Sequence, residues 1–276
     1  MDVAAYLRRI DYAGPVAPSA QVLAAIHRAH TFCVPFENLD MHLGRTIALD
    51  ADAWFDKIVA RRRGGYCFEL NGLFAELLVA VGFEVTHLAA RVMLGDDMVR
   101  PRSHRLLRVR GDGREWLADV GFGGNGLIDP LPFEVDRVHQ QGAERLHLRE
   151  PEPGQYRLEA EIRGRWEGLY RFSREAQLPV DYLHANYYLS HAPESIFTQT
   201  RICTKPTADG RLILQDRRFT IRRNGVSERT TIHTRDEYAA VLRARFGLAL
   251  DDDEIDRLYE GATAMPRPPS HEWDAE

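Results

Sequence analysis

The stretch RRRGGYCFELNGLF, from Arg61 to Phe74, is the most informative part of the chain. After its paired glycines, apolar residues recur with the period of a helix from Cys67 as far as Gly82, which is placed to end that helix. Cys67 is therefore predicted to lie at a helix N-terminus. The unpaired backbone N–H groups of that position, and the arginines before it, favour a thiolate over a thiol. We take Cys67 as the candidate nucleophile, whereas Cys33 and Cys203 lack this setting and are expected in the core.

Helices are also predicted on the N-terminal side of this stretch. Ser19 can cap the segment that follows it, and Asp50 can cap a second segment, which is expected to stop at Gly64-Gly65. On the C-terminal side, the chain changes to short alternating runs separated by Gly, Asp and Pro, which predict a β-rich middle. The last part combines a hairpin signal at Asn224-Gly225 with a capping box from Thr234 to Glu237, and is predicted to be mixed α/β.

A β-hairpin is predicted for the segment SHRLLRVRGDGREWLADVGFGG. A two-residue turn at Gly111-Asp112 places His104 directly opposite Asp119. A turn at Asp112-Gly113 leaves the two diagonal, but either turn keeps both side chains on one face of the sheet. A His and an Asp that face each other across a hairpin often form a hydrogen bond that is only structural. With a cysteine nearby, however, the carboxylate orients the imidazole and the imidazole takes the thiol proton, so Cys67, His104 and Asp119 are the predicted catalytic group.

A glycine-rich loop from Val120 to Gly126 follows this hairpin, and its backbone can approach a ligand closely. The stretch from Arg100 to Arg114 carries a local excess of arginine. Such an excess suits a phosphorylated substrate or cofactor, although arginines that alternate along a strand also form ordinary solvated faces.

The bulk composition excludes several classes of protein. With 276 residues, of which 44% are hydrophobic and 28% charged, the chain has the balance of an ordinary globular protein and is large enough to need no disulfides. Its formal net charge of -5 gives no overall attraction to nucleic acid or to an anionic membrane. Its three cysteines show no paired spacing, so we expect neither a disulfide framework nor a metal site. The charged N-terminus and the lack of a long apolar run favour a cytoplasmic location.

These motifs resemble a known family. RRRGGYCFELNGLF is similar to the nucleophile motif of the arylamine N-acetyltransferases of bacterial type. Two further pieces fall in that family's order, VPFENLD from Val34 to Asp40 and the hairpin from Ser103 to Gly124. The resemblance covers the N-terminal half clearly and the C-terminal third more weakly. Leu70 stands where many bacterial members carry His, outside the catalytic group.

The resemblance implies an α+β fold with an N-terminal helical bundle, a central β-barrel and a C-terminal α/β lid, around a Cys-His-Asp triad of the cysteine-protease kind. We expect these parts at residues 1–85, 86–195 and 196–276. By the same resemblance, Cys67 accepts an acetyl group from acetyl-CoA, His104 carries the proton and Asp119 holds His104. An aromatic amine or hydrazine then takes the acetyl group in a ping-pong cycle.

Binding residues outside the triad also follow from the resemblance. The positions that correspond to contacts with the pantetheine or phosphates of acetyl-CoA are Ser103, Gly123, Gly124 and Tyr188. The positions that correspond to apolar walls of the acceptor pocket are Phe36, Phe122 and Phe197. No metal is implied, and the physiological acceptor, the preferred acyl chain and homodimer formation are left open.

Other functions are compatible with the same three catalytic residues. Thiol proteases and transglutaminases use Cys, His and Asp in this order, and an amide synthase would keep the family fold but close an amide bond on a polyketide chain. A binding module without turnover is a further alternative, which the intact triad disfavours. Acylation of the cysteine by acetyl-CoA, and not by a peptide or a glutamine amide, would separate these readings.

Overall fold

Helices of the N-terminal part begin at the predicted capping residues. The computed structural model describes residues 1–93 and 98–262. The Ser19 hydroxyl accepts a hydrogen bond from the Val22 N–H, and the Asp50 carboxylate accepts one from the Ala53 N–H. The elements of this part are α1 (Val3–Arg9), α2 (Ala20–Cys33), β1 (Phe36–Glu37), α3 (Leu39–His42), α4 (Ala51–Phe55), the π-helical turn η1 (Asp56–Ala60) and α5 (Cys67–Val81). Gly82 ends α5 with a left-handed φ of 104°, as predicted.

The helix that Asp50 begins ends earlier than predicted, at Ala60. The chain then turns through Arg62, whose φ of 51° is left-handed, and this turn accompanies the entry of the Arg63 side chain into the interior. Gly64 is needed for a different reason than helix termination. A Cβ at Gly64 would lie 2.2 Å from the carbonyl oxygen of Pro35, so only glycine fits where these two segments meet.

The middle part is an antiparallel sheet of eight strands that curls into a nearly closed barrel, in the order β5-β4-β3-β2-β9-β8-β7-β6. Its strands are β2 (Glu84–Val92), β3 (His104–Gly111), β4 (Arg114–Ala118), β5 (Leu131–Pro132), β6 (Val138–Gln141), β7 (Glu144–Glu152), β8 (Gln155–Ile162) and β9 (Arg165–Phe172). Leucines and aromatic residues from most of these strands form its buried core. The β-rich middle and the barrel are therefore confirmed.

The hairpin of β3 and β4 adopts the second of the two predicted registers. Gly111 pairs with Arg114, so the turn is formed by Asp112 and Gly113, both with left-handed φ angles. Asp119 follows the last residue of β4 and lies diagonal to His104, the first residue of β3. The two side chains therefore share one face, as both registers required.

The C-terminal part combines short helices with a second sheet of order β1-β10-β11-β12-β13. Its elements are the 3-10 turn η2 (Pro179–Tyr182), α6 (Leu183–His191), α7 (Ile196–Gln199), β10 (Ile202–Thr207), β11 (Gly210–Gln215), β12 (Arg218–Arg223), β13 (Val226–Thr231), α8 (Arg235–Ala240), the π-helical turn η3 (Val241–Arg245) and α9 (Asp252–Gly261). The predicted hairpin turn at Asn224-Gly225 connects β12 and β13, and the Thr234–Glu237 capping box begins α8, so both predictions are confirmed.

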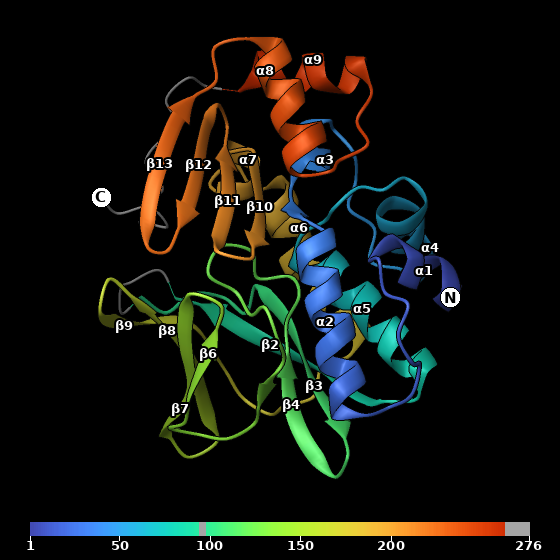
Figure 1. The fold of residues 1–276 in the computed structure, drawn as a ribbon, viewed down its shortest axis with the longest axis vertical. Coiled ribbons are helices and arrows are strands. Elements are labelled where there is room, and N and C mark those ends of the chain that lie inside the picture. Colours follow the sequence, from blue (N-terminus) through green and yellow to red (C-terminus); the bar gives the residue numbers. More distant parts are fainter. Residues whose placement is uncertain (94–97, 263–276) are drawn as a thin grey trace.

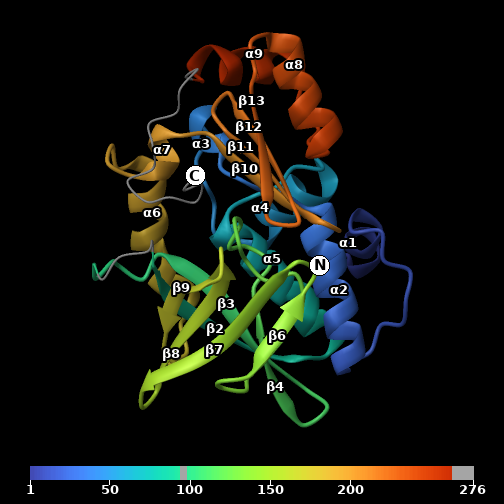
Figure 2. The ribbon, with the colours of Figure 1, turned by 60° about the vertical axis from the view of Figure 1, so that its left-hand side comes forward.

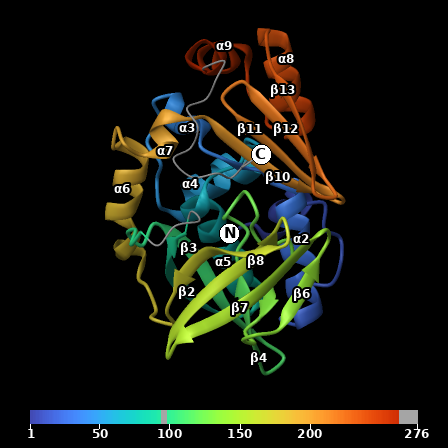
Figure 3. The same cartoon turned by 90° about the vertical axis from the view of Figure 1, so that its left-hand side faces the viewer.

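Strand β1 was not predicted, and it connects the N-terminal part of the chain to the C-terminal sheet. Phe36 pairs with Thr204 and Glu37 with Cys203, so a segment of the N-terminal part forms the edge of the C-terminal sheet. Figure 1 shows this sheet above the barrel, with α8 and α9 over it and α2 and α5 along the side. Figures 2 and 3 show α6 and α7 beside the same sheet and barrel. The α+β class is thus confirmed.

Candidate active site

Cys67 is the first residue of α5, as predicted, and is 4% exposed. The residue before it, Tyr66, is the N-cap, and the Glu69 carboxylate accepts a hydrogen bond from the Tyr66 N–H at 3.0 Å. The Cys67 sulfur lies 3.7 Å from the carbonyl oxygen of Ser103 and within hydrogen-bonding reach of His104. Cys67 therefore lies between the start of a helix and the start of a barrel strand.

His104 and Asp119 form a direct hydrogen bond of 2.7 Å between Nε2 and Oδ2. The other ring nitrogen, Nδ1, is thereby left for Cys67. Burial alone would lower the pKa of His104, but the Asp119 carboxylate and the Cys67 sulfur raise it to about 10. His104 is therefore an imidazolium at neutral pH, with the Asp119 carboxylate on one side and the Cys67 sulfur on the other. The structure thus brings Cys67, His104 and Asp119 together.

Asp119 is itself held by three donors. Its Oδ1 accepts hydrogen bonds from the Asn71 side chain at 2.8 Å and from the Gly121 N–H at 3.0 Å. Burial raises the pKa of Asp119, but His104, Asn71 and the Gly121 N–H outweigh this effect and lower it below its usual value. The carboxylate therefore stays ionised although it is buried.

Asn71 and His27 support this site but were missed as site residues. Asn71 lies one helical turn after Cys67, and its Oδ1 accepts a hydrogen bond from the Val120 N–H at 2.9 Å. His27, on α2, accepts a hydrogen bond from the Asp119 N–H at its Nε2 and donates one from its Nδ1 to the Ile128 carbonyl. Spacing from Cys67 could have indicated Asn71, whereas His27 belonged to an apolar stripe and resembled a core residue.

The glycine-rich loop touches the nucleophile through Gly121. A Cβ at Gly121 would lie 3.0 Å from the Cys67 Cα and 2.9 Å from the Asn71 Nδ2, so the close approach requires glycine. The next residue, Phe122, packs edge-on against the His104 ring with a centroid distance of 5.1 Å. The loop therefore covers two members of the candidate triad.

The three phenylalanines predicted for the acceptor pocket lie in two groups. Phe36 and Phe122 line a small cavity of about 20 Å³ together with Asp119 and Gly123. Phe197 lies outside this lining, but its ring centroid is 5.9 Å from that of Phe36. A cavity of this volume holds about one water molecule.

The four residues predicted to contact acetyl-CoA are dispersed. The Ser103 carbonyl faces Cys67. Gly123 and Gly124 adjoin β10, because a Cβ on Gly123 would lie 3.0 Å from the Thr204 hydroxyl, and the Gly124 N–H donates to that hydroxyl at 3.2 Å. Tyr188 is exposed on α6, beside Glu194. The structure thus places Ser103 beside Cys67, Gly123 and Gly124 beside β10, and Tyr188 on α6.

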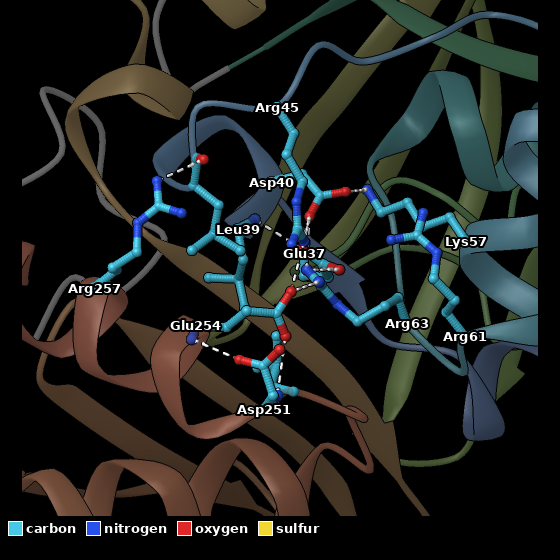
Figure 4. A network of polar contacts seen from close by, with 12 residues as sticks. Glu37, Leu39, Asp40, Arg45, Lys57, Arg61, Arg63, Asp251, Glu254 and Arg257 are labelled. Carbon is cyan, nitrogen blue, oxygen red and sulfur yellow. Dashed lines mark hydrogen bonds and ion pairs between the residues drawn. The ribbon is translucent and has the colours of Figure 1, made fainter.

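The arginines before Cys67 do not surround the thiol as expected. Arg61 forms an exposed pair with Asp56, whereas Arg63 is buried against Glu37 and Asp40 at 2.9 and 3.1 Å. These acids raise the pKa of Arg63 against the effect of burial. Figure 4 shows the cluster around Arg63, which extends to Glu254 on α9. The cation beside Cys67 is therefore His104, not one of these arginines.

Lys57 connects this cluster to the nucleophile helix. Its ammonium contacts Asp40 at 3.1 Å and Glu69 at 2.8 Å, and its side chain is 5% exposed. Glu69 in turn accepts the Tyr66 N–H at the start of α5. Arg45 bonds both Asp40 and Glu254, so a continuous set of ion pairs runs from α9 to Glu69 in the first turn of α5.

Two kinds of feature are absent from the described part of the chain. Within residues 1–93 and 98–262, no group of three or more His, Cys, Asp and Glu side chains is placed to hold a metal ion. In the same ranges, no helix combines the length and the apolar character needed to cross a membrane.

The sequence of this chain is similar to those of several known proteins. A family model described as N-acetyltransferase matches residues 19–255. The arylamine N-acetyltransferase of Escherichia coli (strain K12) is 37% identical over 251 residues, which cover 90% of this chain and 89% of that protein. The arylamine N-acetyltransferase of Mycolicibacterium smegmatis is 38% identical over 259 residues, which cover 91% and 94%.

Solved structures agree with the sequence relatives. The arylamine N-acetyltransferase from Salmonella typhimurium has a TM-score of 0.88 at 32% identity, covering 94% of this chain and 97% of its own. The Mycobacterium marinum arylamine N-acetyltransferase in complex with CoA has a TM-score of 0.89 at 33% identity, covering 95% and 100%. Because the matches in sequence and in structure extend over nearly the whole chain, it belongs to the arylamine N-acetyltransferase family, whose members are acyltransferases.

Proposed function

We propose that this protein transfers an acetyl group from acetyl-CoA to an aromatic amine or hydrazine, with Cys67 as nucleophile, His104 as proton carrier and Asp119 as the residue that orients His104. The observation that carries the proposal is the order of contacts Cys67–His104–Asp119, with the 2.7 Å bond on the carboxylate side. In this mechanism the His104 imidazolium lies between the Asp119 carboxylate and the Cys67 thiolate, and its positive charge stabilises the thiolate until a thioester binds.

The first half-reaction forms an acetyl-cysteine. The Cys67 thiolate attacks the acetyl carbonyl carbon, a bond to the Cys67 sulfur forms, and the bond to the coenzyme A sulfur breaks. His104 gives its Nδ1 proton to the departing thiolate. In the second half-reaction the amine nitrogen attacks the acetyl-cysteine, His104 takes the proton that nitrogen loses, and the Cys67 thiolate is restored.

Burial of the triad supports transfer over hydrolysis. Cys67, His104 and Asp119 are 4%, 2% and 1% exposed, so water has little access to an acetyl-cysteine at this position. We assign the acetyl-CoA contacts to Ser103, Gly123, Gly124 and Tyr188, and the acceptor walls to Phe36, Phe122 and Phe197. The Mycobacterium marinum relative in complex with CoA supports coenzyme A as the carrier of the acyl group.

The test is intact mass spectrometry of the protein mixed with acetyl-CoA in the absence of any amine. Wild type should gain one acetyl group, and an arylamine or a hydrazine such as isoniazid should discharge it, whereas Cys67→Ala should gain none. Asp119→Asn should keep the fold and lose most of the acylation rate, because the amide favours the wrong His104 tautomer. Wild type that takes no acetyl group would favour a thiol hydrolase or an amide synthase on the same triad.

A further inference from the structure

Arg105 follows His104 in the sequence, and its guanidinium is buried beside the first turn of α5. The residue is 3% exposed, and it donates to the Phe68 carbonyl at 3.3 Å and to the His87 Nδ1 at 3.1 Å. The guanidinium also faces the rings of Trp54 and Tyr182, at 5.2 and 4.8 Å from their centroids. Two aromatic faces and the carbonyl of the residue that follows Cys67 therefore hold this cation.

This cation lacks a carboxylate partner. Throughout residues 1–93 and 98–262, no Asp or Glu lies within ion-pair distance of Arg105, and its Nε has no hydrogen-bond partner. Burial lowers the pKa of Arg105, and the acidic groups that counteract this effect are Tyr182, Cys67 and the half-buried Glu76. His87 cannot share the charge, because burial and Arg105 lower its pKa to about 4. Arg63, by contrast, is equally buried and contacts two carboxylates.

The charge of the triad explains why such a cation is useful. A thiolate, an imidazolium and a carboxylate together carry one net negative charge, and a buried net charge is costly unless an opposite charge compensates it. Tyr182 does not supply the negative charge that Arg105 balances. Burial raises the pKa of its hydroxyl, which donates a hydrogen bond to the Leu88 carbonyl. The guanidinium contacts the carbonyl of Phe68, the residue that follows Cys67, so Cys67 is the buried acidic group that this contact brings near Arg105.

We propose that Arg105 is a positioning residue of the transfer reaction, whose charge balances the net negative charge of the triad and thereby stabilises the Cys67 thiolate. This inference rests on the proposed function of the triad. The other charged or titratable groups near Cys67 include His104 from β3, Asp119 from the loop after β4, Tyr66 at the N-cap of α5, Glu69 in its first turn, and Tyr182 from η2. Of these only His104 supplies a positive charge, so loss of Arg105 should make the thiolate harder to form.

The experiment measures the rate of Cys67 alkylation by iodoacetamide as a function of pH, without acetyl-CoA. Arg105→Met and Arg105→Gln should raise the pH midpoint by about one unit, which lowers the rate about tenfold below the midpoint. Arg105→Lys should keep the wild-type midpoint, because it keeps the charge. The control is Arg108→Met, on the same strand, which removes a cation that is paired with Glu115 and should leave the midpoint unchanged.

An unchanged midpoint in a folded neutral variant overturns the proposal. If neither neutral variant folds, Arg105→Lys decides alone, since a shift there as large as one unit would show that the guanidinium geometry matters and the charge does not. Circular dichroism establishes folding in each case. Failure of the proposed transfer would instead appear in wild type as absence of the acetyl-enzyme, independently of these alkylation rates.

Discussion

The side-chain amide of Asn71 donates a hydrogen bond of 2.8 Å to the carboxylate of Asp119, and so joins the nucleophile helix to the end of strand β4. The same amide donates to the Arg105 carbonyl at 2.6 Å and accepts the Val120 N–H, so it closes the gap between helix and barrel. The geometry of the proposed triad therefore depends on Asn71, to which the proposed mechanism assigns no chemical step.

Asn71→Ala should reduce kcat for acetyl transfer by at least about tenfold, because Asp119 loses a donor and the Val120 N–H loses its acceptor. The buried groups left without partners should also lower the free energy of unfolding by about 1–3 kcal/mol. Gln141→Ala is the matched control, since this buried amide also bonds backbone groups, those of Ile128 and Asp129, but has no hydrogen bond to Cys67, His104 or Asp119. Steady-state kinetics and urea unfolding of both variants separate the two effects; equal activity losses would contradict the prediction.

Gly121→Ala should impair the reaction more than it impairs folding. The added methyl group would meet Cys67 and Asn71 at about 3 Å, so the loop or the helix start must move by a few tenths of an ångström. We expect the acylation rate at saturating acetyl-CoA to fall about 10- to 100-fold. Gly113→Asn, in an open turn with a left-handed φ that asparagine tolerates, should retain wild-type acylation. A stopped-flow measurement that finds Gly121→Ala unimpaired would exclude the close approach as a functional requirement.

The raised pKa of His104 predicts how stability depends on pH. Because its folded-state pKa of about 10 lies above the ordinary value near 6.5, the stabilising contribution is fully present below about pH 6.5 and is lost as the pH rises through 10. The difference in free energy of unfolding between wild type and His104→Gln should therefore shrink between pH 7 and pH 10. Denaturant titrations at each pH measure this difference, in which the titrating groups that do not interact with His104 cancel. A constant difference would mean that His104 is not protonated in the folded protein.

Lys57→Met should destabilise the protein by about 3–5 kcal/mol, because it leaves the buried carboxylates of Asp40 and Glu69 without their shared cation. Arg61→Met provides the control, since its pair with Asp56 is exposed and worth at most about 1 kcal/mol. Urea unfolding gives both values. Similar losses in the two variants would show that the buried ion pairs contribute no more than a surface pair.

Local sequence signals located the elements of this fold well. Ser19, Asp50 and Thr234 each cap the helix assigned to them, and Cys67 begins a helix because capping depends on neighbours only a few residues away. The hairpin of β3 and β4 was predicted in two registers, and its turn dipeptide alone could not choose between them. The diagonal pairing of His104 and Asp119 depended on that choice, but their common face did not.

Contacts between distant segments could not be predicted in this way. Arg63 was expected near the thiol because it is near Cys67 in the sequence, but buried acids from residues 37 and 40 bind it in a different direction. His27 reaches Asp119 from α2, and Arg105 reaches the first turn of α5 from β3; each has the sequence surroundings of an ordinary core or surface residue. Such roles depend on tertiary packing, for which one sequence contains no periodic signal.

The pairing of β1 with β10 has a consequence for synthesis of the chain. Phe36 leaves the ribosome long before its partner Thr204 does. The pairing of β1 with β10 therefore cannot form until most of the polypeptide has been made. During that time Glu37 can already bind Arg63, because both belong to the first part to emerge. A nascent chain that ends before residue 202 therefore leaves the edge of β1 that faces β10 without its partner strand.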